Sequence, residues 1–489
     1  MERIRSLLKK VVGRFSSSKE QPSTSSSVSE EEEATELHPR YLLRLRIQNA
    51  LRERTELPEP LPAVKAATNT ISAAPPAKTP IIDKAAPRPI PHELVFMWPP
   101  IRQVVLGRFL LTSKLRRKLV RRPQLMSLVT QDGLRGMGLS NLAAHIYYHD
   151  SDKFFPDGKY WLDLSGGNAK SALRGLLHEL NVDSKQMRNN LSTLSRLLHE
   201  QLAGERVLLV LSHAEALSPK NSAEVLRQVE QIRLPSPAIT LVTSTFSLYP
   251  KQEIQVDLFS QADGLTFLRS KLGWKRKDEK QEQEHAVQLI ERLNGFPLAL
   301  ELTVKRMTLS TPPQNCELAL AALEDATNQA EALQLPFRKK GEQYVAESFL
   351  LSYNMLSDKL KAVFHALGVC APSGVSVIAL AHMMEQSPHD IDLWLVELMT
   401  YSLANYDRDR GRARMNALLH DYAALLAQTD HDQYKKMLTR HQQHFKEEIA
   451  GRYQQALNNP QKEDTLLALK QIDAEADNVR LAQQRAFTT

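Results

Sequence analysis

Continuous apolar runs constrain the fold of this chain more than any other feature of its sequence. Residues 207–211 read Val-Leu-Leu-Val-Leu, and residues 238–243 read Ala-Ile-Thr-Leu-Val-Thr. A strand that is apolar along its whole length is buried on both faces, which is typical of a parallel sheet covered by helices on both sides. The two runs therefore predict central strands of an α/β sheet.

Three segments with a weaker strand pattern complete the predicted sheet. Residues 125–130 form a short apolar run, residues 160–164 alternate apolar and polar side chains, and residues 254–258 give a fifth strand. Helical patterns separate these segments, and strands that alternate with helices pair in parallel through right-handed crossovers. Beyond Phe259 the pattern is mainly helical, apart from a hairpin near residues 401–416.

Composition narrows the class of protein. A chain of 489 residues is too long for a single domain of ordinary size. Hydrophobic residues make up 42% and charged residues 24%, as in globular proteins. No segment approaches the roughly 18 apolar residues of a membrane span. Cys316 and Cys370 lie far apart without CxxC spacing, so we expect no disulfide framework and no metal site. These features predict a multidomain cytoplasmic protein.

The amino-terminal arm has its own composition. Residues 1–15 place apolar side chains at helical spacing with basic side chains on the other side, which predicts a basic amphipathic helix. This helix is a candidate for peripheral contact with an anionic membrane, for a targeting segment, or for docking on a partner. Residues 16–94 are serine-rich and acidic and then proline-rich, which predicts a disordered linker with one isolated helix at residues 41–54.

Two basic clusters are candidate contacts for nucleic acid. One lies in a helical segment at residues 112–122, and the other lies in the predicted hairpin around Gly411, with its arginines at 408, 410, 412 and 414. A basic hairpin is typical of a wing that touches DNA. Charged side chains also solvate an exposed helix face or protect an edge hairpin from aggregation. We favour solvated surfaces for both clusters, so nucleic acid is not an expected partner.

Ligands of parallel α/β sheets bind beyond the carboxyl ends of the strands. The first strand is followed by the segment Gly-Leu-Arg-Gly-Met-Gly-Leu-Ser-Asn at residues 133–141. Its glycines and its serine match the phosphate-binding pattern GxxxxGK[ST], but Leu139 takes the position of the lysine. Ser212 and His213 follow residues 207–211, where a nucleoside triphosphatase needs acids for magnesium and for the attacking water.

Ser212 and His213 also suggest a nucleophile and its base, as in a hydrolase. We do not expect this function, because the chain lacks a GxSxG elbow. In addition, side chains at adjacent positions of a strand point to opposite faces of the sheet. The pair is therefore interpreted as a replacement of the magnesium-binding acids.

The order of these motifs resembles that of the NB-ARC branch of the STAND signalling ATPases, over residues 95–430. The matching segments are Gly107-Arg108, the glycine loop at 133–140, the strand at 207–211, Leu241–Ser244, Asn294–Leu300, Ser348–Leu356 and Arg414–Ala423. The resemblance implies four parts. They are a P-loop NTPase-like α/β domain at 95–260, a small helical domain at 261–335, a winged-helix domain at 336–427 and a helical hairpin at 428–489.

The resemblance also implies a nucleotide site. Members of the family bind ADP at rest and exchange it for ATP. The residues that would surround the phosphates are Gly133, Gly136, Gly138, Leu139, Ser140 and Asn141, and Pro297 would pack near the adenine. The chain departs from the family wherever a charged or switching side chain is expected. The replacements are Leu139 for lysine, Ser212 and His213 for acids, Thr245 for arginine and Asn416 for histidine.

These departures predict a non-catalytic regulatory or signalling scaffold, with no cofactor or with weakly bound ADP. One alternative is a working ADP/ATP switch that takes its missing cation from Arg135 or from a neighbouring protomer. Another is a DNA-binding regulator that uses the winged helix. A protein partner would bind the winged helix or the apolar seam of the hairpin at 428–489, and the resemblance leaves oligomerisation open.

Overall fold

The structure is a computed structural model of the 489-residue chain. The residues that it describes are 105–149, 154–183, 186–187, 190–333, 341–449, 451, 454, 458 and 472–486. The helix expected at residues 1–15 and the linker expected at residues 16–94, with its helix at 41–54, lie outside the described residues. All described residues belong to one unit of the chain, Lys84–Thr489.

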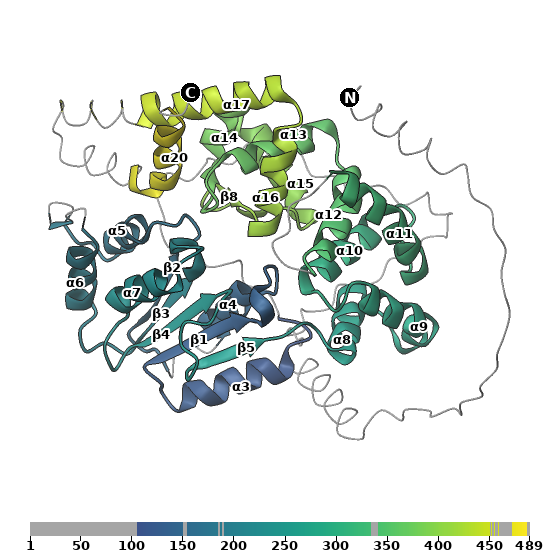
Figure 1. Ribbon diagram of the computed structural model, residues 1–489, viewed down its shortest axis with the longest axis horizontal. Helices are drawn as coiled ribbons and strands as arrows, with labels where there is room; N and C mark the ends of the chain where they lie inside the picture. Colours follow the sequence, from purple (N-terminus) through teal and green to yellow (C-terminus); the bar gives the residue numbers. More distant parts are fainter. Residues whose placement is uncertain are drawn as a thin grey trace, which may run out of the picture. The chain divides into compact units, whose positions relative to one another are not determined.

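A five-stranded parallel sheet forms the first part of this unit (Figure 1). Its strands are β1 (Leu125–Thr130), β2 (Gly158–Asp163), β3 (Val207–Ser212), β4 (Ile239–Ser244) and β5 (Glu253–Val256). They lie in the order β2-β3-β4-β1-β5, and every neighbouring pair is parallel. The predicted α/β class with a parallel sheet is confirmed. The weaker strands begin or end up to two residues from their expected bounds.

Helices cover both faces of the sheet. They are α3 (Phe109–Val120), α4 (Leu139–His149), α5 (Ala169–Glu179), α6 (Leu191–Gln201) and α7 (Ser222–Ile232). Successive β3 side chains enter opposite cores, because side chains alternate along a strand. Leu209 and Leu211 pack with α5, α6 and α7, whereas Leu208 and Val210 pack with α3 and α4. This two-sided burial explains why β3 reads as an uninterrupted apolar run.

Asparagine side chains start three of these helices. Asn168, Asn190 and Asn221 each accept a hydrogen bond from a backbone N–H in the first turn of α5, α6 and α7, respectively. An asparagine at this position satisfies a donor that has no partner within the helix. Local sequence therefore fixes where the helices that follow β2 and β3 begin.

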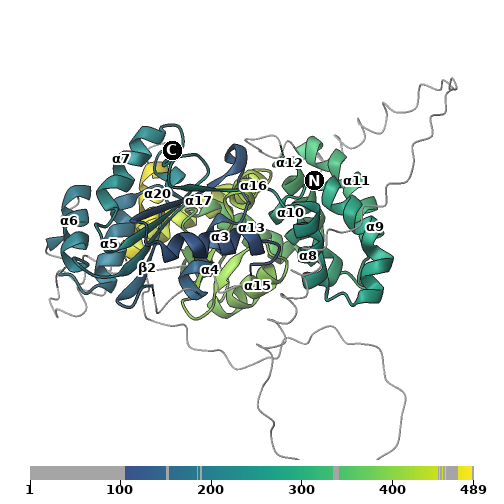
Figure 2. The ribbon, with the colours of Figure 1, turned by 90° about the horizontal axis from the view of Figure 1, so that it is seen from below.

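A helical region follows the sheet, and its first five helices are grouped together in Figure 2. These are α8 (Gln261–Leu272), α9 (Arg276–Arg292), α10 (Pro297–Leu309), α11 (Cys316–Leu333) and α12 (Gln343–Asn354). The next helices are α13 (Asp358–Val369), α14 (Val377–Met384), α15 (Pro388–Thr400), α16 (Ala417–Ala427), α17 (His431–Gln443) and, after a π-helical turn, α20 (Ala476–Ala486). One apolar core runs through the region, and in it Phe349 packs against Phe364 and Tyr422 with ring centroids 5.4 and 5.1 Å apart.

A small antiparallel sheet lies among α13, α14, α15 and α16. Its order is β6 (Val375–Ser376), β8 (Arg412–Arg414) and β7 (Asn405–Asp407). Strands β7 and β8 form the hairpin expected near residues 401–416, whereas β6 is too short to give a sequence pattern. Three short strands among helices suit a winged helix, but this assignment and the domain bounds stay predictions. No helix in the described part of the chain has the length and apolar content needed to cross a bilayer.

Candidate functional site

The glycine loop joins β1 to α4 at the carboxyl edge of the sheet. Gly133, Gly136 and Gly138 have φ values of 72°, 78° and 82°, a conformation that side chains with a β-carbon rarely adopt. A β-carbon on Gly136 would lie 3.0 Å from Leu298 Cδ2, whereas the space around Gly138 is open to 4 Å. The glycines therefore serve a tight turn packed against the start of α10.

The structure brings the predicted nucleotide-site residues together. Leu139, Ser140 and Asn141 are the first three residues of α4, and Pro297 begins α10 beside Leu298, which contacts the loop. The carbonyl of Gly138 accepts the first helical hydrogen bond, from Leu142 N–H at 3.0 Å. The backbone N–H groups of residues 139–141 have no carbonyl acceptor within their own helix. Such a helix start suits an anion, and its occupancy by phosphate remains a prediction.

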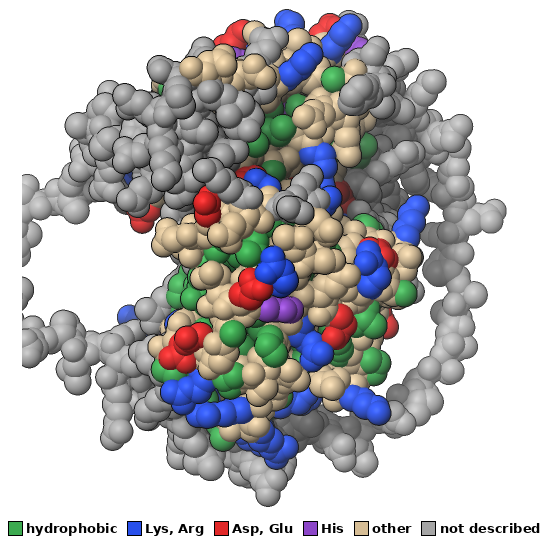
Figure 3. Space-filling model, turned by 90° about the vertical axis from the view of Figure 1, so that its left-hand side faces the viewer, with side chains coloured by type: hydrophobic (Ala, Val, Ile, Leu, Met, Phe, Trp, Pro, Cys, Tyr) green, Lys and Arg blue, Asp and Glu red, His purple; other side chains and the backbone are tan. Residues whose placement is uncertain are grey.

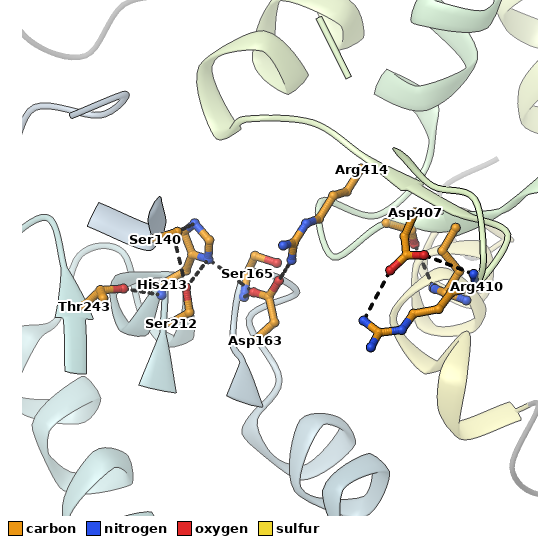
Figure 4. A network of polar contacts seen from close by, with 11 residues as sticks. Ser140, Asp163, Ser165, Ser212, His213, Thr243, Asp407, Arg410 and Arg414 are labelled. Carbon is orange, nitrogen blue, oxygen red and sulfur yellow. Dashed lines mark hydrogen bonds and ion pairs between the residues drawn. The ribbon is translucent and has the colours of Figure 1, made fainter. Parts of the chain in front are cut away.

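Ser140 makes side-chain contacts with Ser212, the last residue of β3, and with His213, which follows it (Figure 4). Its Oγ lies 3.1 Å from His213 Nε2 and 3.2 Å from Ser212 Oγ. Ser212 Oγ is also 3.1 Å from His213 Nδ1. The expectation that the Ser212 and His213 side chains diverge is therefore wrong. Strand geometry ends at Ser212, and His213 is left-handed with φ 60° and ψ 45°, which turns its ring back over the strand end.

Asp163 completes this cluster, and its contribution was not recognised in the sequence. It ends β2 and lies next to Ser212 in the β2–β3 register. Asp163 Oδ1 is 3.2 Å from His213 Nδ1 and accepts a 3.0 Å hydrogen bond from Ser165 N–H. Its other oxygen pairs with Arg414 of β8. The only signal in the sequence was an acid at the end of an expected strand, and pairing register is what places it beside His213.

Burial and ion pairing compete at this cluster. Burial alone would raise the pKa of Asp163, but Arg414 and His213 outweigh it and hold that pKa well below its usual range. Burial would lower the pKa of His213, but the Asp163 carboxylate outweighs it and raises that pKa above its usual value. The His213 side chain is 32% exposed, so solvent screens its interactions in part. The cluster therefore joins an ionised Asp163 to an imidazole whose pKa is raised.

Glu215 is a second acid near this cluster. It lies in a short 3₁₀ helix, Ala214–Leu217, directly after His213. Its Oε2 is buried without a hydrogen-bond partner among the described atoms, and burial raises the pKa of its carboxyl group. Glu215 comes three residues after the end of β3. Acids were expected directly after the strand, so Glu215 was not recognised in the sequence.

Arg135, in the middle of the glycine loop, forms ion pairs with two carboxylates. Its Nε and Nη2 each donate to Glu342 at 3.0 Å, and its Nη1 donates to Asp421 at 2.5 Å. The side chains of Arg135 and Glu342 are 10% and 0% exposed. Burial lowers the pKa of Arg135, but the two carboxylates outweigh it and raise that pKa. Arg135 therefore does not supply the missing phosphate cation in this structure, because its charge is used to join the loop to α12 and α16.

A groove of about 830 Å³ lies beside the loop. Its lining includes Asp132, Gly133, Thr245, Glu253 and Tyr344. The two charged residues of this lining, Asp132 and Glu253, are acidic. The lining therefore offers no basic side chain to a phosphate. Thr245 stands where the resemblance implies an arginine. Asn416, which stands where the resemblance implies a histidine, caps α16 by accepting from Leu418 N–H at 3.0 Å.

The hairpin arginines form ion pairs, which corrects the expectation of a solvated edge. The pairs are Arg408–Asp392, Arg410–Asp407, Arg412–Glu475 and Arg414–Asp163. Arg412 and Arg414 have side chains only 13% and 8% exposed. By contrast, Arg116, Arg117, Arg121 and Arg122 of the first basic cluster are exposed, as expected of a solvated face. On the face drawn in Figure 3, basic and acidic side chains lie interspersed over much of the surface.

The residues present do not fit a magnesium ion. The Ser140 hydroxyl, which would face the ion in a phosphate-binding loop, is bonded to Ser212 and His213. Magnesium prefers carboxylate and water oxygens, whereas the described partners of Ser140 Oγ are a hydroxyl and an imidazole. Within the same residues no group of three or more histidine, cysteine or acidic side chains has the arrangement of a metal site.

No known family model matches the chain. The chain is 26% identical over 307 residues to the regulatory protein AfsR of Streptomyces griseus, a match that covers 61% of this chain and 30% of that protein. It is 24% identical over 310 residues to AfsR of Streptomyces coelicolor, covering 62% and 30%. The chain therefore spans about 30% of the length of these relatives.

One solved structure that is similar to this chain comes from an archaeal protein. It is a Signal Transduction ATPase with Numerous Domains (STAND) protein with a tetratricopeptide repeat sensor, from Pyrococcus horikoshii. The match has a TM-score of 0.45 and 14% identity, and it covers 80% of this chain and 54% of that one. The sequence similarity is therefore to proteins named as regulatory, and the described residues form a parallel α/β sheet.

Proposed function

We propose that this chain is a regulatory or signalling scaffold of the STAND type whose loop site binds nucleotide weakly or not at all. The observation that carries the proposal is the hydrogen bond between Ser140 Oγ and His213 Nε2. It directs the serine hydroxyl to an imidazole at the strand end where an ATPase needs carboxylates. The site thus keeps the loop backbone of a P-loop protein with different side-chain chemistry.

The missing charges have a large energetic effect. A hydrogen bond to a charged group contributes about 1.5–3 kcal/mol, so replacing the lysine by Leu139 weakens phosphate binding roughly 10- to 150-fold. Phosphoryl transfer depends almost wholly on electrostatic stabilisation and positioning. A site that presents Ser212 and His213 to the phosphates lacks that stabilisation, and hydrolysis of ATP is not expected.

Ion pairs within the protein replace the charge contacts that a nucleotide would supply. Arg135 links the loop to α12 and α16, and Arg414 links β8 to the end of β2. Both connections form from the chain's own residues. They support a scaffold in which these elements are joined without ADP.

Calorimetry on the full chain tests the proposal, with ADP and ATP each titrated with and without magnesium. The expected result is weak or undetectable binding that magnesium does not strengthen, and purified protein that carries no stoichiometric nucleotide. Tight binding that requires magnesium would instead identify a working switch. A protein partner, bound through the region of α13–α16 or the carboxyl-terminal helices, is the expected ligand of the scaffold.

The ion pairs of the hairpin argue against DNA binding. A wing needs unpaired basic side chains to release counterions from phosphates, whereas the hairpin arginines face carboxylates. Fluorescence anisotropy with duplex DNA over a range of salt concentrations checks this point. Binding that falls steeply with salt would favour the DNA-binding regulator.

A further inference from the structure

We infer that Ser140, His213 and Asp163 form a catalytic triad for acyl transfer. Ser140 Oγ lies 3.1 Å from His213 Nε2, and His213 Nδ1 lies 3.2 Å from Asp163 Oδ1. A nucleophile that bonds to one ring nitrogen, with a carboxylate on the other, is the arrangement that activates serine in unrelated hydrolase folds. The inference goes beyond the scaffold function, which concerns nucleotide.

The proposed triad uses one tautomer of His213. With its proton on Nδ1, the ring donates to Asp163, and Nε2 accepts from the Ser140 hydroxyl. Asp163 is itself held by Ser165 N–H and Arg414, which keep it ionised and in place. The backbone N–H of His213 donates to Thr243 Oγ1 at 3.0 Å, which anchors the base. Each member therefore has the orientation that its role requires.

The surroundings of Ser140 suit a developing oxyanion. Ser140 is the second residue of α4, so backbone N–H groups without helical acceptors point out of the helix beside its hydroxyl. Ser140 is partly exposed and the His213 side chain is 32% exposed, whereas Ser212 is fully buried. Ser140 is accordingly the nucleophile, and an acyl ester is the substrate class that this chemistry takes.

The reaction balances with water as the second reactant. Ser140 Oγ attacks the ester carbonyl, and its proton passes to His213 Nε2. The tetrahedral intermediate collapses, the bond from carbon to the leaving oxygen breaks, and Nε2 gives the proton to the departing alcohol. A water molecule, deprotonated by Nε2, then attacks the acyl carbon. The bond from that carbon to Ser140 Oγ breaks, Nε2 returns the proton to Oγ, and the carboxylic acid leaves.

A fluorophosphonate probe tests the nucleophile without knowledge of the natural ester. The expected result is one adduct per chain by intact mass, mapped to Ser140, in which Oγ bonds to phosphorus and fluoride leaves. Ser140→Ala should abolish labelling, and His213→Gln should slow it at least about 100-fold. Ser192→Ala is the matched control, because Ser192 is the second residue of α6, as Ser140 is of α4, and its loss should leave labelling unchanged.

The pH dependence separates this chemistry from incidental modification. The groups that face His213 are Asp163 at the end of β2, Glu215 after β3 and Arg414 of β8. Labelling needs the neutral imidazole, so its rate should rise with pH through a midpoint above 6.5, the usual value for histidine. A rate independent of pH, or an adduct on Ser212, overturns the inference.

A second variant gives a gain of reactivity. Ser140→Cys places a thiol on His213, where the imidazole promotes ionisation, and iodoacetamide at neutral pH should alkylate it rapidly. The native Cys316 and Cys370 are buried, and burial raises the pKa of both thiols, so background labelling is low. Absence of both the fluorophosphonate adduct and rapid alkylation rejects the triad. Neither result depends on nucleotide binding, which is tested separately by calorimetry.

Discussion

Arg414 pairs with Asp163 across 251 positions of the chain, and the pair joins the small antiparallel sheet to the end of β2. Both side chains are largely buried, with 8% and 11% exposure. Because Asp163 also bonds to His213, one carboxylate connects the candidate site to the carboxyl-terminal half of the protein.

Removing this carboxylate should destabilise the protein. Asp163→Asn removes a carboxylate partner of the largely buried Arg414, and breaking a buried ion pair costs about 3–5 kcal/mol in comparable cases. Urea unfolding followed by circular dichroism measures the change. Arg227→Gln, which breaks the exposed Arg227–Glu224 pair, is the control and should leave the unfolding midpoint unchanged. Equal midpoints for the two variants would contradict a stabilising role of the Asp163–Arg414 pair.

The two titrating members of the site predict opposite pH dependences. The folded-state pKa of Asp163 is below its usual 3.8, so its stabilisation is present above pH 3.8 and is lost as pH falls further. The folded-state pKa of His213 is above 6.5, so its stabilisation is present below pH 6.5 and is lost as pH rises through the raised value. Thermal unfolding of the wild type and His213→Gln should show a stability difference that shrinks between pH 6 and pH 9, whereas a constant difference would contradict it.

Breaking the loop anchor should loosen a defined part of the chain. Arg135→Ala removes the guanidinium that pairs with the fully buried Glu342 side chain, and about 3–5 kcal/mol of destabilisation is expected. Hydrogen–deuterium exchange should rise in residues 131–138, α12 and α16 before the strands. Arg135→Lys should restore only part of the protection, because lysine lacks the two-pronged geometry of the guanidinium group. If the wild type and both Arg135 variants exchange at the same rates in these segments, Arg135 is not a local anchor.

Restoring the lysine tests the energetic argument about the loop. Leu139→Lys should strengthen ADP binding roughly 10- to 150-fold, measured by calorimetry. Magnesium should add nothing to this variant, because Ser212 and His213 still occupy the strand end. The double variant Leu139→Lys with Ser212→Asp should gain a magnesium dependence. If Leu139→Lys changes nothing, another feature of the loop prevents binding.

Within the described residues, the helical and apolar patterns predicted the architecture well. The runs at 207–211 and 238–243 became β3 and β4, and the glycine segment became the turn into α4. These features are local, because burial on both faces selects apolar residues and positive φ selects glycine. No comparable local signal predicts the order of the strands in the parallel sheet, or the short strand β6 of the small sheet.

Sequence alone established that the loop lacks a lysine and that the strand end lacks acids, because these are statements about residue identity. Tertiary structure alone decided where the remaining charges point. Arg135 faces Glu342, Arg414 faces Asp163, and His213 turns back onto Ser140. Those partners are remote in the chain, and the free energy of burying a charge depends on the counterion that the fold brings to it.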